Sequence, residues 1–396
     1  MMNAPRPLAL QALSVLASGL ALMAHPDVLE AQVPVTSLGL GAPVAATDGR
    51  TAALGGAAVG LLGGSLNLLN PADLTGFAGN VIGLSLNPES ITLVTAGGED
   101  QAKRSRIGLM QAVVPIGRWV VGVGLRNELD QDFLVVFPDT LVTSFGRFPF
   151  EEKREHDGGI SSLDISLARR VGPLTVGVSG GPVFGALRQV VSRRFEADPT
   201  GVMPTLTPVE DFSRLTYAAS RIRGGLAWEA DGRFRIGGSV SRTSALEADQ
   251  QDTGVTQQFD MPIEVAFGGS ARLSPKLLLA ASGGWSQWSR AKGDFNSVGV
   301  ASVTWAGGGI EWSHLTLGSA SVPLRLGYRF ADLPFFPIGR RQARETAVTF
   351  GLGLSTAGGK AVLDLSGEVG SRGEAAVSGF EESFTRTALT ISIRRP

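Results

Sequence analysis

Two features of the sequence have residue types that could support catalysis or metal binding. Residues 177–181 read Gly-Val-Ser-Gly-Gly, which fits the Gly-x-Ser-x-Gly string of hydrolases, but they fall inside a predicted strand with no helix after it. A nucleophile elbow requires a strand, a sharp turn and then a helix. His156 and His314 are the only histidines beyond residue 31, too few for a histidine metal site. The sequence therefore predicts no catalytic residue, no metal ligand and no cofactor.

Charged side chains on the polar faces of the predicted strands are a second set of candidates. These are Arg126, Arg223, Arg235, Arg325, Arg329 and Arg386, with Asp164, Glu264, Asp364 and Glu368. One interpretation is that these charges pair with one another across neighbouring strands. The other is that an unpaired arginine binds an anionic head group such as a carboxylate, for which guanidinium has a bidentate geometry. Under the second interpretation, Arg325, Arg329 and Arg386 are the predicted ligand-binding residues.

The elements that carry these charges read as strands, because apolar and polar residues alternate along them. In residues 322–330, Val, Leu, Leu, Tyr and Phe alternate with Pro, Arg, Gly and Arg, and the same pattern marks 347–354, 363–369 and 388–394. Ten less regular strands are predicted at 80–88, 105–115, 118–128, 160–170, 173–191, 214–230, 233–245, 258–273, 276–290 and 297–313. The pattern thus predicts about fourteen strands.

The connections between these strands alternate between short and long. Tight turns are expected near residues 115–118, 171–173, 231–233, 274–276, 317–320 and 358–359. Longer or more charged connections are expected near 89–104, 129–159, 192–213, 246–257, 291–296, 331–345 and 370–383. This alternation favours an antiparallel transmembrane β-barrel of about fourteen strands over residues 80–396, with both ends of the chain on the periplasmic side. A soluble β-sandwich is the alternative, but it seldom has so many strands in one unit.

Composition agrees with a barrel, with two exceptions. The 35 basic and 36 acidic residues nearly cancel, so nothing indicates a nucleic-acid partner, and the absence of Cys excludes disulfides and thiolate metal sites. The mean hydropathy of +0.15 suits strands with one lipid-facing and one polar face. Aromatic residues are scarce at 7%, however, and the chain ends in Arg-Arg-Pro rather than in an aromatic residue. Six tryptophans in or beside predicted strands are candidates for the membrane interface: Trp119, Trp228, Trp285, Trp288, Trp305 and Trp312.

The residues before the barrel divide into two parts. Residues 1–31 resemble a signal peptide, with Arg6 before a mostly apolar run at 8–23, and cleavage is expected after residue 24 or 31. An N-terminal anchor helix is the alternative, although the run is short for a spanning helix. Residues 32–79 include a small, glycine-rich segment, Arg50 to Leu74, which does not alternate and is predicted to fold into the barrel lumen as a plug. Lumen-facing glycines at 122, 124, 177, 237, 351 and 353 would admit it, although such glycines also mark bulges.

Several stretches resemble a known family. The N-terminal motif consists of Arg50, Leu54, Gly55, Gly56, Asn70, Pro71 and Leu74. Together with residues 284–289 and 326–335, it resembles the FadL/TodX-type outer-membrane transporters of long-chain fatty acids and aromatic hydrocarbons. The resemblance implies a fourteen-stranded barrel closed by an N-terminal hatch, an apolar pocket near the hatch, and lateral release of ligand into the membrane. A related branch acts in protein secretion, and the motif does not separate the branches.

Together these observations predict a passive outer-membrane channel for a hydrophobic small molecule, in contact with outer-membrane lipid. An apolar segment within a barrel is typical of such a pocket, because ligand sites are mostly lined by apolar side chains. The alternatives are a barrel component or shuttle of a secretion machine, which would have protein partners, a lipid-hydrolysing barrel, and an open pore for polar solutes.

Overall fold

A computed structural model describes residues 35–45, 48–95, 98–143, 146–196, 206–291, 293, 295, 298–318, 320–355 and 359–395. The expected signal peptide, residues 1–31, lies outside the described residues and stays a prediction.

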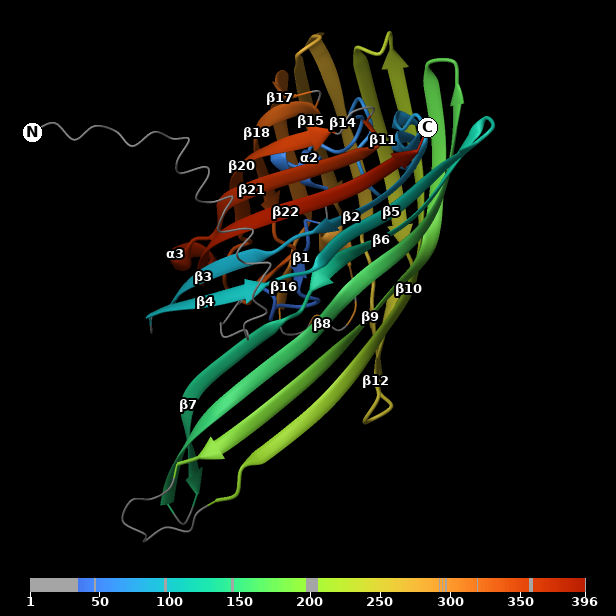
Figure 1. Ribbon diagram of the computed structural model, residues 1–396. Coiled ribbons are helices and arrows are strands. Elements are labelled where there is room, and N and C mark those ends of the chain that lie inside the picture. The colour runs from blue at the N-terminus through green and yellow to red at the C-terminus, as the bar shows by residue number, and fades with distance from the viewer. Residues whose placement is uncertain are drawn as a thin grey trace, which may run out of the picture.

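Within the described residues, fourteen antiparallel strands pair in a closed ring (Figure 1). In ring order they are β2 (Asn80–Leu86), β5 (Ile107–Ile116), β6 (Trp119–Asp130), β8 (Gly146–Val171), β9 (Leu174–Phe195), β10 (Val209–Ala230), β11 (Phe234–Thr243), β14 (Ile263–Ser274), β15 (Leu277–Ser286), β17 (Val303–Leu317), β18 (Ala320–Asp332), β20 (Arg344–Ser355), β21 (Ala361–Gly373) and β22 (Glu381–Arg395). The ring closes where β22 pairs with β2, from Asn80 opposite Arg395 to Leu86 opposite Leu389. The predicted fourteen-stranded barrel is confirmed.

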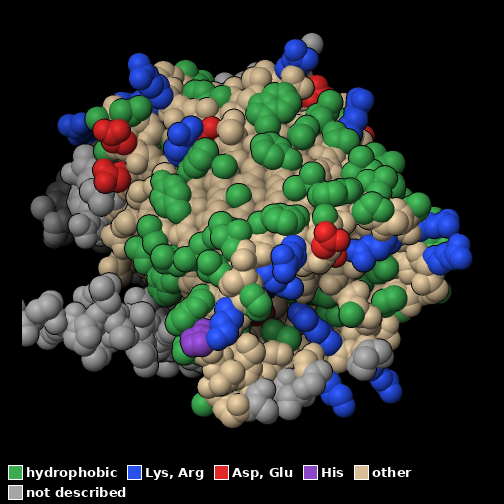
Figure 2. All heavy atoms as spheres, turned by 90° about the horizontal axis from the view of Figure 1, so that it is seen from above, with side chains coloured by type: hydrophobic (Ala, Val, Ile, Leu, Met, Phe, Trp, Pro, Cys, Tyr) green, Lys and Arg blue, Asp and Glu red, His purple; other side chains and the backbone are tan. Residues whose placement is uncertain are grey.

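The outer surface of the ring is apolar. Large hydrophobic side chains project outward from successive strands, and Ile82, Ile165, Ile222 and Phe267 each leave about 60% of their surface exposed, at 59, 60, 63 and 60%. On the face shown in Figure 2, hydrophobic side chains form a broad band, and Lys and Arg side chains gather mainly around its margin. Such a belt is stable only in contact with lipid, because a soluble protein rarely exposes so large an apolar surface.

The connections at one end of the barrel are longer strand pairs rather than the loops expected from the sequence. The region predicted as a loop at 129–159 contains β7 (Phe133–Thr143), which pairs with the first half of β8. Strands β8, β9 and β10 continue beyond the ring as one sheet with β7 (Figure 1). Residues 89–104 likewise form β3 (Glu89–Thr95) and β4 (Gly98–Arg104). β7 and β4 lack the apolar alternation of a lipid-facing strand, and β3 alternates over only four residues, Ser90–Leu93, so the sequence pattern did not predict these strands.

Three predicted strands differ from the observed ones: two are divided and one ends early. The strand predicted at 258–273 divides into β13 (Thr256–Phe259), paired with β12 (Leu246–Gln250), and β14. Pro262 lies at the break, and proline has no N–H to donate to a strand ladder. The strand predicted at 276–290 stops at Ser286 and is followed by the short 3-10 helix η2 (Trp288–Arg290), and that predicted at 297–313 divides into β16 (Val298–Val300) and β17. β16 pairs outside the ring with β19 (Phe335–Pro337), and a helical turn, α3 (Ala375–Ser378), precedes β22.

Residues 48–77, called here the inner segment, run across the inside of the ring. They contain the helical turn α2 (Gly49–Ala53) and the 3-10 helix η1 (Pro71–Gly76), and they follow β1 (Ala42–Pro43), which pairs with the end of β6. α2 lies against β18, β20, β21 and β22, and η1 lies against β6, β8, β9, β10 and β11. The residues between them contact the remaining strands, for example through Ser270 of β14 and Ser282 of β15. Among the described residues, no helix has the length and apolar character needed to cross a membrane.

Glycines on the inner faces of the strands allow this close approach. A methyl group on Gly177 would lie 2.5 Å from the backbone nitrogen of Ala72, and one on Gly307 would lie 1.8 Å from the carbonyl oxygen of Gly55. Of the six glycines singled out from the sequence, those at 122, 124, 177, 237 and 351 face inner-segment atoms in this way, whereas Gly353 faces Asp364 and Arg325. Gly177 and Gly307 therefore accommodate the backbone of the inner segment, and the glycines at 122, 124, 237 and 351 accommodate its side chains, so a larger residue at these positions would displace it.

Candidate functional site

Arg50 joins the inner segment to the barrel wall. Its Nε and Nη2 donate to the two carboxylate oxygens of Glu311 on β17, at 2.8 and 2.9 Å, and its Nη1 donates to the carbonyl oxygen of Gly64 at 3.0 Å. Glu311 also accepts from Nε of Arg325 at 2.7 Å. Arg50 thus fixes both the fold of the inner segment and its position against β17.

The other residues of the N-terminal motif shape the inner segment itself. Gly55 and Gly56 both have positive φ, at 68° and 79°, so the chain turns sharply after α2. Asn70 caps η1 by accepting from Ala72 N at 3.1 Å, and its Nδ2 donates to the carbonyl oxygen of Leu226 at 3.1 Å, while Pro71 occupies the first position of the helix. Leu54 and Leu74 are buried. Most of the motif is therefore structural, and Gly55 and Gly56 are its members that line the cavity described below.

Two buried carboxylates that the sequence did not single out also hold the inner segment. Asp48 caps α2 by accepting from Thr51 N at 2.8 Å, and its second oxygen accepts from Leu66 N at 2.8 Å. Burial raises the pKa of the Asp48 carboxyl above its ordinary value, and nearby Asp364 adds to the rise. Asp73 accepts from Gly60 N at 3.0 Å and forms an ion pair with Arg235 at 3.2 Å. The sequence signal that could have identified Asp48 is its position directly before Gly-Arg-Thr, because an aspartate commonly caps the start of a helix.

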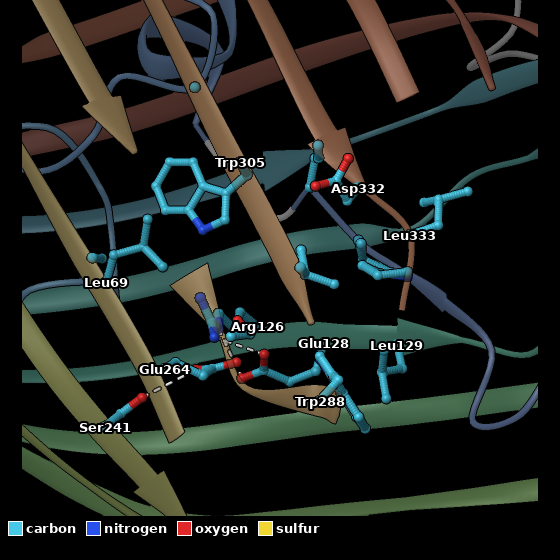
Figure 3. A pocket seen from close by; sticks show the side chains of 18 of the residues that line it. Leu69, Arg126, Glu128, Leu129, Ser241, Glu264, Trp288, Trp305, Asp332 and Leu333 are labelled. Carbon is cyan, nitrogen blue, oxygen red and sulfur yellow. Dashed lines mark hydrogen bonds and ion pairs between the residues drawn. The ribbon is translucent and has the colours of Figure 1, made fainter. Parts of the chain in front are cut away.

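A cavity of about 260 Å³ lies between the inner segment and the wall on the side of the long extensions. Its apolar lining comes from Leu69 of the inner segment and from Leu129, Ile160, Val183, Met261, Trp288, Val303, Trp305, Phe330 and Leu333. In the view of Figure 3, Leu69 and Trp305 lie on one side of the cavity and Trp288 and Leu129 on the other. Predominantly apolar walls with a few polar groups are typical of a site for a small hydrophobic ligand.

The polar part of the lining is an ion-pair cluster. Arg126 forms a bidentate pair with Glu128, at 2.8 and 2.6 Å, and Arg221 donates to the same carboxylate (Figure 3 shows the Arg126–Glu128 pair). Arg223 donates to the carbonyl oxygen of Leu68 in the inner segment, and its Nη1 lies 3.5 Å from an Asp164 carboxylate oxygen. The cluster therefore connects the cavity wall to the backbone of the inner segment.

The apolar wall continues beyond the cavity toward the extended strands. Trp288 packs edge-on against Phe335, with ring centroids 5.1 Å apart, and Phe295 stacks on Phe335 at 5.6 Å. The same buried cluster includes Leu40, Leu187, Tyr217, Leu246, Ala248 and Phe259. The cavity is therefore bordered on the long-extension side by a packed apolar cluster that shares Trp288 with its lining.

The three arginines predicted to bind ligand are ion-paired in this structure. Arg325 donates to Asp364 at 2.6 Å as well as to Glu311, and Arg329 donates to Glu368 at 2.9 and 3.1 Å. Arg386 donates to Glu368 at 3.1 Å and to Glu89 at 2.9 Å. The pairing that the sequence offered as one of two interpretations is therefore present. Of these three arginines, Arg329 lines the cavity, whereas Arg325 and Arg386 lie outside it.

The tryptophans divide into two groups that the sequence did not distinguish. Trp119, Trp228, Trp285 and Trp312 point outward and are 38–43% exposed, as expected for an interfacial position. Trp288 and Trp305 line the cavity instead, so their prediction as interfacial residues was wrong. Trp288 lies in η2, after β15 has ended. The strand predicted to continue to residue 290 therefore gave the wrong direction for its side chain.

Comparisons with known proteins give structural matches without sequence matches. No family model and no curated protein matches the chain. The toluene transporter TodX of Pseudomonas putida aligns with a TM-score of 0.55 and 16% identity, over 90% of this chain and 98% of TodX. The toluene transporter TbuX of Ralstonia pickettii aligns at 0.54 and 15%, over 87% and 97%. A FadL homologue of Pseudomonas aeruginosa aligns at 0.54 and 12%, over 89% and 98%.

At these identities the likeness shows the fold. The chain has the fold of the FadL/TodX-type channels, so the predicted resemblance is confirmed at that level. A closed barrel with an apolar outer belt is the architecture of a protein that spans the outer membrane of a Gram-negative cell.

Proposed function

We propose that the protein is a passive channel for small hydrophobic molecules, and that the cavity beside the inner segment is its binding site. The cavity itself carries this proposal, because a largely apolar chamber deep inside a membrane barrel has little use for a polar solute. At about 260 Å³ it exceeds the roughly 150 Å³ that holds one benzene molecule in an apolar protein cavity. The toluene transporters TodX and TbuX share the fold.

In this proposal residues 32–79 form the hatch of the channel, residues 80–396 form the barrel, and residues 1–31 are the signal peptide. A barrel of fourteen strands encloses a lumen that would leak if it were empty. The inner segment contacts strands all round the ring, and its contacts include charged pairs such as Arg50 with Glu311. Ligand would reach the cavity from the long-extension end, past the apolar cluster around Trp288, and leave without energy input once the inner segment shifts.

Arg329 is the proposed polar contact of a bound ligand. It lines the cavity with its partners Glu345 and Glu368, so its charge is already balanced. An arginine whose charge is already balanced by carboxylates can still donate a hydrogen bond to a neutral polar group. Binding an anionic ligand would cost more, because the anion would be buried next to those carboxylates. We therefore expect hydrocarbons and weakly polar ring compounds to bind in preference to strong anions.

Trp288→Ala tests the binding site. Loss of one aromatic wall should weaken binding of toluene to the purified protein about tenfold, as expected for an aromatic contact worth about 1.4 kcal/mol. Binding is measured by tritiated-toluene equilibrium dialysis in detergent. Trp312→Ala is the matched control, because Trp312 faces outward and is 42% exposed.

Equal toluene affinity in the Trp288→Ala variant and the wild type would contradict the proposed site. Copurification of stoichiometric proteins, with no toluene binding by the wild type, would favour the secretion role instead. Transport is tested separately, by uptake of the same compound into cells that express the wild type or Trp288→Ala.

A further inference from the structure

The end of the barrel with short turns carries an excess of positive charge. The short turns and the three residues on either side of each include eight arginines and lysines but only two carboxylates, Glu229 and Asp231. One of the eight, Arg235, is buried and paired with Glu229 and Asp73, which leaves seven basic residues at the rim. The whole chain, in contrast, has a net charge of −1. Basic residues are therefore concentrated at this rim, where they favour an anionic partner.

A recess lies in this rim between two neighbouring turns, residues 117–118 between β5 and β6 and residues 172–173 between β8 and β9. It is lined by Arg118, Arg169 and Arg170, with Trp119 on its outer side and Thr75 of the inner segment on its inner side. The turns are adjacent because β6 pairs with β8, which sets Trp119 directly opposite Arg169. The register of the barrel thus places three guanidinium groups around one recess.

These arginines are incompletely paired within the described part of the chain. Arg170 donates to Glu229 at 2.8 Å, but Glu229 also accepts from Arg235 at 2.7 Å. Arg169 lies over the ring of Trp119, 5.1 Å from its centroid, and its buried Nε has no hydrogen-bond partner among the described residues. No ion pair of Arg118 occurs among them either. The recess therefore holds more positive charge than nearby carboxylates balance.

The outer side of the recess is at the depth of lipid head groups. Trp119 is 43% exposed, and Ile116, Val171 and Leu174 beside it also face outward. Trp228 and Trp312 occupy similar positions near other short turns. Indoles of this kind mark the boundary between hydrocarbon and water in membrane barrels. A ligand in the recess would thus contact arginines at one end and the apolar outer belt at the other.

We propose that the recess binds the phosphate of an anionic phospholipid, such as phosphatidylglycerol, in the leaflet at the short-turn end. Arg118 and Arg169 would donate to the phosphate oxygens, and the acyl chains would lie along Ile116, Val171 and Leu174. The adjoining apolar surface favours a lipid over a soluble phosphate, which would gain nothing from it. The site is separate from the channel cavity and does not depend on what the channel carries.

The test is native mass spectrometry of the full mature protein, released from nanodiscs that contain equal amounts of phosphatidylglycerol and phosphatidylcholine. The wild type should retain phosphatidylglycerol preferentially, and R118Q/R169Q should reduce this retention roughly 25-fold, since each of the two arginines near a membrane surface contributes about fivefold. R233Q is the matched control, because Arg233 is an exposed arginine on another short turn of the same rim. Circular dichroism checks that each variant keeps its β-structure.

Two results would overturn the proposal. The first is equal retention of the two lipids by the wild type. The second is an equal loss in R233Q and R118Q/R169Q, which would mean that the rim acts only through its total charge. Glycerol 3-phosphate added to the wild type in detergent separates the two phosphate sources, because the proposal expects no retention of it and tight retention would indicate a soluble ligand.

Discussion

The substitution Arg50→Ala tests whether the inner segment keeps the lumen closed. Arg50 makes a bidentate pair with Glu311, and each side chain is only 11% exposed. Removing one partner of a buried pair costs about 3–5 kcal/mol. Glu311 would keep its bond to Arg325, so we expect the lower value, about 3 kcal/mol. Since 1.4 kcal/mol is tenfold, the population with the inner segment displaced should rise roughly a hundredfold.

Single-channel conductance in planar bilayers measures this population directly. The wild type should show rare openings, and Arg50→Ala should open far more often with the same unit conductance. Arg344→Ala is the control, since the Arg344 side chain is 56% exposed in its pair with Asp332 and such pairs contribute little. If Arg50→Ala opens no more often than Arg344→Ala while remaining folded, the inner segment does not close the lumen through this contact, and the hatch proposal loses its main support.

Two further substitutions test the packing of the barrel. Gly327→Ala places a methyl group 2.5 Å from the backbone nitrogen of Gly55, so it should displace the inner segment and raise the conductance. Gly224→Ala is the control, because a methyl group there would have no atom within 4 Å and should leave the conductance unchanged. Equal conductance in the two variants would contradict this packing. Phe267→Arg puts a charge on the lipid-facing surface and should lower the unfolding free energy in bilayers by about 2–4 kcal/mol. Phe212 lies on the extension of β10 beyond the ring, so Phe212→Arg should change the unfolding free energy by less than about 1 kcal/mol. Urea titration measures both values, and equal losses in the two variants would contradict the assignment of Phe267 alone to the lipid-facing surface.

The barrel could be predicted from the sequence wherever one strand face meets lipid and the other meets polar groups. Residues 322–330 and 388–394 show this alternation clearly, and both lie in ring strands. The extensions could not be predicted in the same way. β7 and the first half of β8 pair with each other beyond the ring, and their backbone hydrogen bonds impose no apolar period on the side chains.

The site was predicted only in part, because its residues meet through tertiary contacts. The glycines of the inner segment and the wall were recognised, because close packing of two backbones requires glycine and so raises the glycine content of both segments. Trp288 and Trp305 could not be assigned to the cavity, because their direction depends on where β15 ends and on the register of β17. The arginines were recognised as inward, but their partners, such as Glu345 on the adjacent strand, depend on cross-strand register.

The pairing of β2 with β22 has a consequence for the order of assembly. Each of the other ring pairings joins two strands that are close in sequence. The seam instead joins the first and the last strand of the barrel sequence. Closing so large a loop costs the most chain entropy, so we expect the seam to form after the hairpins. The inner segment immediately precedes β2 and contacts strands on both sides of the seam. The inner segment can be fully enclosed only when this seam closes, so its contacts with the wall are completed at the last step of assembly.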